Sequence, residues 1–140
     1  MANRTERHGV PWEESYGYVQ AVQRGDTIYI SGQLAHDGDR LVAPAPVVNG
    51  VITDFSNMGE QLRRSYANAA ELLGRFGASL DDVVEEVVYA LDCDALFAVA
   101  GPVRKEAYGR PDPQVASTML ATPRLAFPEQ LVEVKFTARV

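Results

Sequence analysis

The sequence predicts an α+β protein in which two helices cover one face of a mixed β-sheet. Apolar residues recur every three or four positions over 57–76 and again over 95–107, which is typical of helices with one buried face. The segments around these helices are rich in β-branched residues or alternate between apolar and polar residues, as strands do. A strand–helix–strand order favours parallel neighbours with both helices on one side, so the other sheet face stays partly apolar. We expect self-association to bury that face.

The first strands follow a segment without periodicity. Residues 1–15 show no apolar repeat, so we expect an extended N-terminal arm that Trp12 pins to the body. A single domain is expected over 16–140, because 140 residues is the usual size of one domain. Its first two strands are predicted over 17–24 and 27–33, where two strand-like segments flank a short turn.

A tight hairpin and a long helix are predicted next. Asn49-Gly50 lies between two pairs of β-branched residues, which is a strong signal for a two-residue hairpin turn. The helix over 57–76 has Asn57 at its start and Glu60 at the reciprocal position of a capping box. Gly77 is placed to end this helix in the left-handed conformation. The predicted buried stripe consists of Met58, Leu62, Tyr66, Ala69, Leu73 and Phe76.

The second half of the chain continues with a strand, a helix and two more strands. The segment 82–91 is rich in β-branched residues, which predicts a central strand. The second helix is predicted over 95–107, and two prolines make 109–113 a loop. The last strands are predicted over 115–122 and 131–139. In the final strand one face consists of Val132, Val134, Phe136 and Ala138, and the other of Glu133, Lys135 and Thr137.

Composition disfavours several kinds of partner. The formal net charge is 13 − 19 = −6 and no basic block occurs, so we expect no nucleic-acid partner. No run approaches the roughly 20 apolar residues that cross a bilayer, so no membrane partner is expected. The single cysteine, Cys93, is compatible with a reducing, cytoplasmic location. His8 and His36 have no suitably spaced partners, and we expect no metal site.

Glu133 is the most informative carboxylate. It interrupts the apolar run 131–134 and lies on the face opposite its apolar neighbours. It is a general acid or base if a cleft raises its pKa, and otherwise a solvated strand residue. The corner 31–33, Ser-Gly-Gln, offers hydrogen-bonding groups beside a glycine that lets a ligand approach the backbone. Tyr18 either bonds a ligand or is a packed ring with a wet hydroxyl.

Four short motifs stand in a fixed order along the chain. They are Tyr18-x-Gln-Ala-Val22, Gly25-Asp-x-Ile-Tyr-Ile-Ser-Gly-Gln33, Gly77-Ala-Ser-Leu-Asp-Asp-Val-Val84 and Phe127-Pro-x-x-Leu-Val-Glu-Val134. Their order and spacing resemble the RidA/YjgF family, also called the endoribonuclease L-PSP family, over residues 16–140. The resemblance implies a chorismate-mutase-like (YjgF) fold that forms a homotrimer, with the sheets in a central barrel, the helices outside and ligand clefts between subunits. It also implies hydrolysis of reactive enamines and imines, such as 2-aminoacrylate, to 2-oxo acids and ammonia, without a metal or an organic cofactor.

Residue by residue, the resemblance places Tyr18, Ser31 and Gly32 in the wall of the cleft, and Glu133 beside the attacking water. The chain departs from the family at two other positions. The arginine that binds the substrate carboxylate in deaminating members falls here at Ser117 or Thr118, depending on where a small indel is placed. The asparagine that follows the second helix's Phe-x-x-Val pattern is replaced by Ala100.

A hydroxyl cannot reproduce a bidentate guanidinium–carboxylate pair, and losing such a contact costs about 2–5 kcal/mol. Ser117 and Thr118 stay candidate ligand contacts. Arg124, in the following loop, either substitutes for the missing arginine or is a surface residue. We therefore expect a substrate that is uncharged or larger than a small 2-imino acid.

The sequence leaves more than one function open. The first is an enamine or imine deaminase with an intersubunit cleft for a small organic metabolite, although whether the chain is an enzyme is not decided. The alternative is a non-catalytic metabolite-binding or chaperone-like member of the same family, which the missing arginine and asparagine favour. A third, an endoribonuclease, comes only from the family's historical name, and the acidic charge argues against it.

Overall fold

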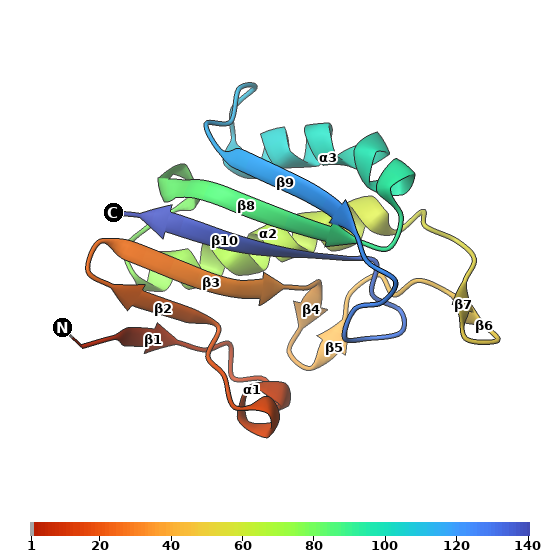
Figure 1. Cartoon of the computed structure of the whole chain (residues 1–140), viewed down its shortest axis with the longest axis horizontal. Helices are drawn as coiled ribbons and strands as arrows, with labels where there is room; N and C mark the ends of the chain where they lie inside the picture. Colours follow the sequence, from red (N-terminus) through yellow and green to blue (C-terminus); the bar gives the residue numbers. More distant parts are fainter. Residues whose placement is uncertain (1) are drawn as a thin grey trace.

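Six strands form one sheet, and the two long helices lie on the same face of it (Figure 1). The computed structural model describes residues 2–140. The strand order is β1 (Arg4–Glu6), β2 (Ala21–Arg24), β3 (Thr27–Gln33), β10 (Val132–Arg139), β8 (Val83–Ala90) and β9 (Ala116–Ala121). Neighbours are antiparallel except β8 and β9, which are parallel because a helix carries the chain from one to the other. The predicted mixed sheet is confirmed.

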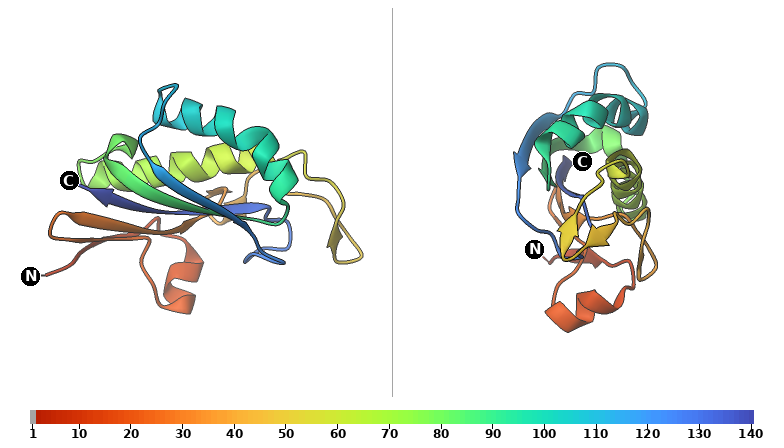
Figure 2. Two further views of the ribbon diagram at one scale, coloured as in Figure 1. Left: turned by 45° about the horizontal axis from the view of Figure 1, so that its top comes forward. Right: turned by 90° about the vertical axis from the view of Figure 1, so that its right-hand side faces the viewer.

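The helices are α2 (Met58–Arg75) and α3 (Cys93–Tyr108), and the short α1 (Pro11–Tyr16) lies on the other side of the sheet (Figure 2). A 3-10 turn, η1 (Leu80–Asp82), leads into β8. Two small hairpins complete the fold, β4 (His36–Asp37) with β5 (Arg40–Leu41), and β6 (Val47–Val48) with β7 (Val51–Ile52). Asn49 and Gly50 have φ values of 51° and 76°, the left-handed conformation that the predicted two-residue turn requires.

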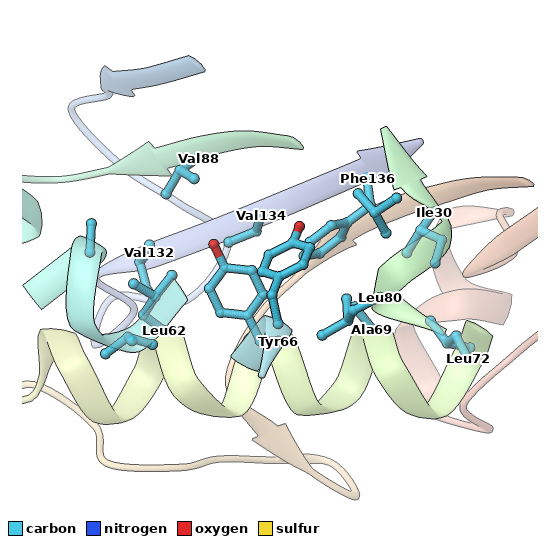
Figure 3. Packing of buried hydrophobic residues seen from close by; sticks show 14 of the residues in the cluster. Ile30, Leu62, Tyr66, Ala69, Leu72, Leu80, Val88, Val132, Val134 and Phe136 are labelled. Atoms are coloured by element: carbon cyan, nitrogen blue, oxygen red, sulfur yellow. The ribbon is translucent and has the colours of Figure 1, made fainter. Parts of the chain in front are cut away.

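The core lies between α2 and the sheet. The predicted stripe of α2 is buried, apart from a partly exposed Phe76, and it faces the inward side chains of β3, β8 and β10 (Figure 3). The ring of Tyr66 packs edge-on against Phe136 with 5.7 Å between ring centroids. Val132, Val134, Phe136 and Ala138 are all buried, as the alternation in the last strand predicted.

The ends of α2 differ in how well the sequence predicted them. The predicted capping box at its start is wrong, because the side chain of Asn57 donates to the carbonyl of Pro44 (3.1 Å) rather than capping the helix. Glu60 instead pairs with Arg63 on the surface. The predicted end is confirmed: Gly77 has φ 76°, and the next N–H bonds back into the last turn of the helix.

The predicted extended arm over 1–15 is only partly correct. Its start pairs with β2 as the edge strand β1, but α1 is a helix that the sequence did not predict. The six residues of α1, which ends before the left-handed Gly17, are too few to display a helical repeat. The predicted packing of Trp12 against the rest of the domain is confirmed, since the centroid of its ring lies 5.4 Å from that of the Phe127 ring.

The sheet face opposite α2 and α3 carries exposed apolar side chains. Strand register places Val87, Tyr89, Thr118 and Leu120 on this open face together with Tyr29 and Glu133. Tyr29 is 55% exposed and Leu120 is 38% exposed. The predicted, partly apolar second face is therefore present. No helix within the described residues is long and apolar enough to cross a membrane.

A buried ionic cluster lies on the helix side of β8 and β9. Glu86 is fully buried and accepts hydrogen bonds from the Tyr66 hydroxyl (2.6 Å) and from Nε of Arg104 (2.7 Å). Arg104 also donates to the hydroxyl of Ser117 (2.9 Å). Burial, followed by the charge of Glu86, raises the pKa of Tyr66, so the phenol stays protonated and donates to the carboxylate.

Candidate functional site

A cavity of about 400 Å³ lies where α1 meets the ends of β3 and β10. Its wall is formed by Pro11, Trp12, Ser15, Tyr16, Tyr18, Gly32, Leu34, Ala126, Phe127 and Glu133. Three residues that the sequence selected are therefore brought together: Tyr18, Gly32 and Glu133. The volume is in the range of small-molecule sites, which are mostly apolar with a few polar groups.

The Glu133 carboxyl group lies directly over Gly32. A β-carbon at position 32 would be 2.6 Å from Cδ of Glu133, so only glycine leaves room for the carboxyl group there. Burial raises the pKa of Glu133, an effect that a long contact from Gln130 Nε2 (3.5 Å) offsets only in part. A carboxyl group with a raised pKa can accept and return a proton nearer neutral pH than an ordinary glutamate can.

Tyr18 supplies a phenol to the same cavity. Its hydroxyl accepts a hydrogen bond from Gln20 Nε2 at 3.5 Å. Burial raises the pKa of Tyr18, and the negative charges of Glu13 and Glu133 act in the same direction. The phenol therefore stays protonated at neutral pH and can donate a hydrogen bond to a ligand.

Ser31 and the two β9 candidates lie outside this cavity. The hydroxyl of Ser31 donates to the carbonyl of Val19 (2.8 Å), which joins β3 to the segment before β2. Ser117 points to the helix side and binds Arg104, whereas Thr118 is exposed on the open face. With strands about 4.8 Å apart and a rise of about 3.3 Å per residue, Thr118 lies about 12 Å from Glu133 at the backbone. One chain therefore does not bring these two residues together.

Arg124 also lies apart from Glu133. It lines a second cavity of about 450 Å³, formed by the β6–β7 hairpin and the loop after β9. Phe127 contributes to the walls of both cavities. The two cavities therefore adjoin at Phe127, with Arg124 in one and Glu133 in the other.

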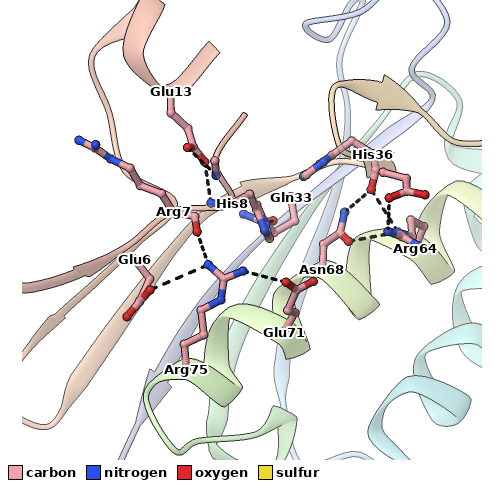
Figure 4. A network of polar contacts seen from close by, with 12 residues as sticks. Glu6, Arg7, His8, Glu13, Gln33, His36, Arg64, Asn68, Glu71 and Arg75 are labelled. Atoms are coloured by element: carbon pink, nitrogen blue, oxygen red, sulfur yellow. Dashed lines mark hydrogen bonds and ion pairs between the residues drawn. The ribbon is translucent and has the colours of Figure 1, made fainter. Parts of the chain in front are cut away.

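The sequence missed the contribution of the arm to the site. Figure 4 shows the polar contacts that fasten this segment, including Arg75, which binds the carbonyl of Arg7 and pairs with Glu6. Nε2 of His8 lies 2.8 Å from Oε1 of Gln33, close to the buried ring of His36. The signal available in the sequence was Pro11, followed six residues later by a glycine, which marks a short helix.

Within the same arm, Glu13 is buried and accepts backbone N–H groups of His8 (2.9 Å) and Gly9 (3.0 Å). Burial opposes ionisation of Glu13, but these hydrogen bonds, a further one from the Gln20 side chain and the charge of His8 together lower the pKa of the carboxyl group. The ionised group thus holds the turn that leads into α1. No cluster of three or more His, Cys, Asp or Glu residues in 2–140 is arranged to hold a metal ion.

Comparison with known proteins identifies the family. The family model for endoribonuclease L-PSP matches residues 12–140. An uncharacterized Streptomyces coelicolor protein, SCO2049, is 28% identical over 98% of this chain and 92% of its own length. Protein mmf1 of Schizosaccharomyces pombe, a mitochondrial protein, is 27% identical over 96% of this chain and 74% of its own.

Two solved structures have closely similar folds. Rv2704 of Mycobacterium tuberculosis, a member of the YjgF/YER057c/UK114 family, matches with a TM-score of 0.77 and 26% identity over 99% of this chain and all of its own. PA3499 of Pseudomonas aeruginosa, a protein of unknown function, matches with a TM-score of 0.78 and 25% identity. The match covers 99% of this chain and 92% of that protein's chain. The fold, the motifs and the family model agree, and the chain belongs to the endoribonuclease L-PSP family, which is the RidA/YjgF family that the sequence resembles.

Proposed function

We propose that the protein hydrolyses a small enamine or imine to a carbonyl compound and ammonia. The observation that carries this proposal is the carboxyl group of Glu133, held over Gly32 in a cavity of about 400 Å³ with its pKa raised by burial. Hydrolysis of an imine needs one group that removes a proton from water and later returns it to nitrogen. Glu133 is suited to both steps, and Tyr18 can hold the substrate by donating a hydrogen bond.

In the proposed reaction the water oxygen attacks the carbon of a protonated imine, and the electron pair of the C=N double bond moves to nitrogen. Glu133 accepts the proton that the water loses, giving a neutral carbinolamine. Glu133 then returns this proton to nitrogen, and the C–N bond breaks as an oxygen lone pair forms the C=O bond. The hydroxyl proton leaves with ammonia as ammonium, so the sum is R₂C=NH₂⁺ + H₂O → R₂C=O + NH₄⁺. An enamine enters after protonation of its β-carbon.

A homotrimer is part of the proposal. Within one chain Thr118 is about 12 Å from Glu133, too far for both to touch one small molecule, and both lie on the open, partly apolar face. A second copy seated on this face would bury Tyr29 and Leu120 and could bring its own Thr118 to the cavity. Ser31, which adjoins Gly32 in the cavity wall, would then line the cleft between subunits. Sedimentation equilibrium is the measurement, and a monomer at micromolar concentration would contradict this assembly.

The activity is tested by generating 2-aminoacrylate and larger imines in situ and following their decay with purified protein. We expect faster decay, a loss of at least 100-fold in Glu133→Gln, and no change in Glu106→Gln, which removes only an exposed ion pair between α3 and Arg63 of α2. No acceleration with any imine, or equal rates for the wild type and Glu133→Gln, would refute the catalytic proposal.

The second candidate is a non-catalytic metabolite-binding protein. One observation favours it: among residues 2–140, no lysine or arginine lines the Glu133 cavity to bind a substrate carboxylate. Thermal-shift screening separates the two functions, since this alternative expects ligands that raise the melting temperature but are recovered chemically unchanged after long incubation.

A further inference from the structure

The cavity beside the Glu133 cavity combines apolar walls with one cation. Its lining includes Val51, Ile52, Phe55 and Leu91, and Arg124 is the only charged residue among the described residues that line it. A guanidinium group in such a setting attracts an anion whose remaining part is apolar.

Arg124 has no protein partner for its charge. Within residues 2–140 its side chain makes one hydrogen bond, a long one from Nε to the carbonyl of the next residue, Leu125 (3.4 Å), and forms no ion pair with a carboxylate. Arg63, Arg75 and Arg110, by contrast, each pair with an acidic residue. The planar donor groups of Arg124 are therefore available to a ligand.

The two cavities adjoin through Phe127, which lines both of them. Taking about 30 Å³ per heavy atom from the volume of a water molecule, a six-atom imino acid fills roughly 180 Å³. This is less than half of either cavity, whose volumes are about 400 Å³ and 450 Å³. A longer ligand that passes Phe127 would use both.

We propose that this double site takes an elongated organic acid, with its reactive enamine or imine end beside Glu133 and a distal carboxylate bound by Arg124. The apolar chain between them lies along Phe127. A monocarboxylate fits better than a phosphate ester, because a single arginine and apolar walls offer too few donors for a doubly charged group with three acceptor oxygens. The inference rests on the proposed function only for the reactive end, and carboxylate binding at Arg124 is independent of turnover.

Binding of unreactive probes tests the proposal. Hexanoate and hexanamide have the same length and differ in charge, and calorimetric titration of the full chain gives the affinity of each. We expect hexanoate to bind at least tenfold more tightly than hexanamide, and Arg124→Gln to abolish that preference. Arg40→Gln, which changes another exposed arginine that forms no ion pair within residues 2–140, should keep this preference. Equal affinity of the acid and the amide, or an unchanged preference in Arg124→Gln, would overturn the proposal.

The single tryptophan shows whether the ligand extends into the Glu133 cavity, because Trp12 lines that cavity and does not line the Arg124 cavity. Across a series from propanoate to decanoate, only the longer acids should change its fluorescence, and Arg124→Gln should remove this length dependence. Binding that depends on Arg124 without imine hydrolysis would uphold this inference and refute the proposed activity. Imine hydrolysis without any preference for carboxylates would uphold the proposed activity and refute this inference.

Discussion

Replacing Gly32 by alanine tests how Glu133 is held. A β-carbon at position 32 would lie 2.6 Å from Cδ and 2.9 Å from Cγ of Glu133, so this side chain must move. Forcing it off its rotamer costs about 0.5–1.5 kcal/mol. Gly32 is not in the left-handed region, so alanine adds no backbone strain and stabilises by about 0.4–1 kcal/mol through the unfolded chain. In the wild-type background Gly32→Ala should therefore change the free energy of unfolding by between about a 0.5 kcal/mol gain and about a 1 kcal/mol loss.

A double-mutant cycle isolates the contact. In a Glu133→Ala background the side chain that blocks the space is gone, so Gly32→Ala should stabilise, and the coupling between the two changes should be about 1 kcal/mol. Gly101→Ala is the matched control, because its β-carbon would meet nothing within 4 Å and should show no coupling to Glu133.

Urea unfolding of all variants at one protein concentration gives these free energies, since self-association would shift them. NMR titration should also show the pKa of the displaced Glu133 falling towards its ordinary value in Gly32→Ala. Equal effects of Gly32→Ala in both backgrounds, within about 0.3 kcal/mol, would refute the reasoning.

Three further changes probe charge inside the fold. Glu86→Gln leaves Arg104 without its buried partner and should lower the free energy of unfolding by about 3 kcal/mol. Glu85→Gln, at an exposed position, should change that free energy by less than about 0.5 kcal/mol. Equal losses in the two variants would contradict a stabilising role for the buried cluster. Burial lowers the pKa of His36 below 6.5. The stability that neutral His36 contributes above pH 6.5 should therefore be lost as the pH falls towards the folded pKa. In His36→Phe, the urea midpoint should depend less on pH between about pH 8 and 5. Burial raises the pKa of Glu133 above 4.5, so its contribution is fully present below pH 4.5 and is lost as pH rises through the folded pKa. Glu133→Gln should therefore gain stability relative to the wild type between pH 4 and 8, and a constant difference would contradict this.

The fold was predictable where a repeat extends over many residues. The stripe on α2 and the alternation on β10 each contain enough positions to define a period, and the structure confirms both. The short elements were not predictable in this way, because α1 has six residues and β1 has three polar ones. The predicted cap of α2 was wrong for another reason, because the Asn57 side chain donates to the carbonyl of Pro44, which is distant in sequence.

The candidate site was predictable in part. Motif matching selected Tyr18, Gly32 and Glu133, and the structure brings them into one cavity. It could not show that Trp12 and Phe127 complete the wall, because their contact joins segments more than 100 residues apart. Nor could the sequence decide where the residues of β9 point.

Strand parity settles that last question and gives a prediction of its own. A shift of one residue turns a side chain to the other face of a sheet, so an alignment uncertain between Ser117 and Thr118 says nothing about the face. The pairing of β9 with β8 shows which face each residue occupies. Ser117 lies opposite Glu86 on the helix side, and Thr118 lies opposite Val87 on the open face. An arginine at 117 would meet Arg104, which already binds the Ser117 hydroxyl, and two adjacent guanidinium groups would repel each other.

Of these two positions, only 118 can therefore present an arginine to a ligand on the open face. If a neighbouring copy brings this position to Glu133, Thr118→Arg should raise the affinity for a short carboxylate such as pyruvate at least tenfold, because it supplies the missing charge-assisted pair. Ser117→Arg should give no such gain and should lower stability through repulsion by Arg104. Calorimetric titration and urea unfolding measure the two effects. A gain in Ser117→Arg, or none in Thr118→Arg, would show that β9 does not contribute to the cleft in this way.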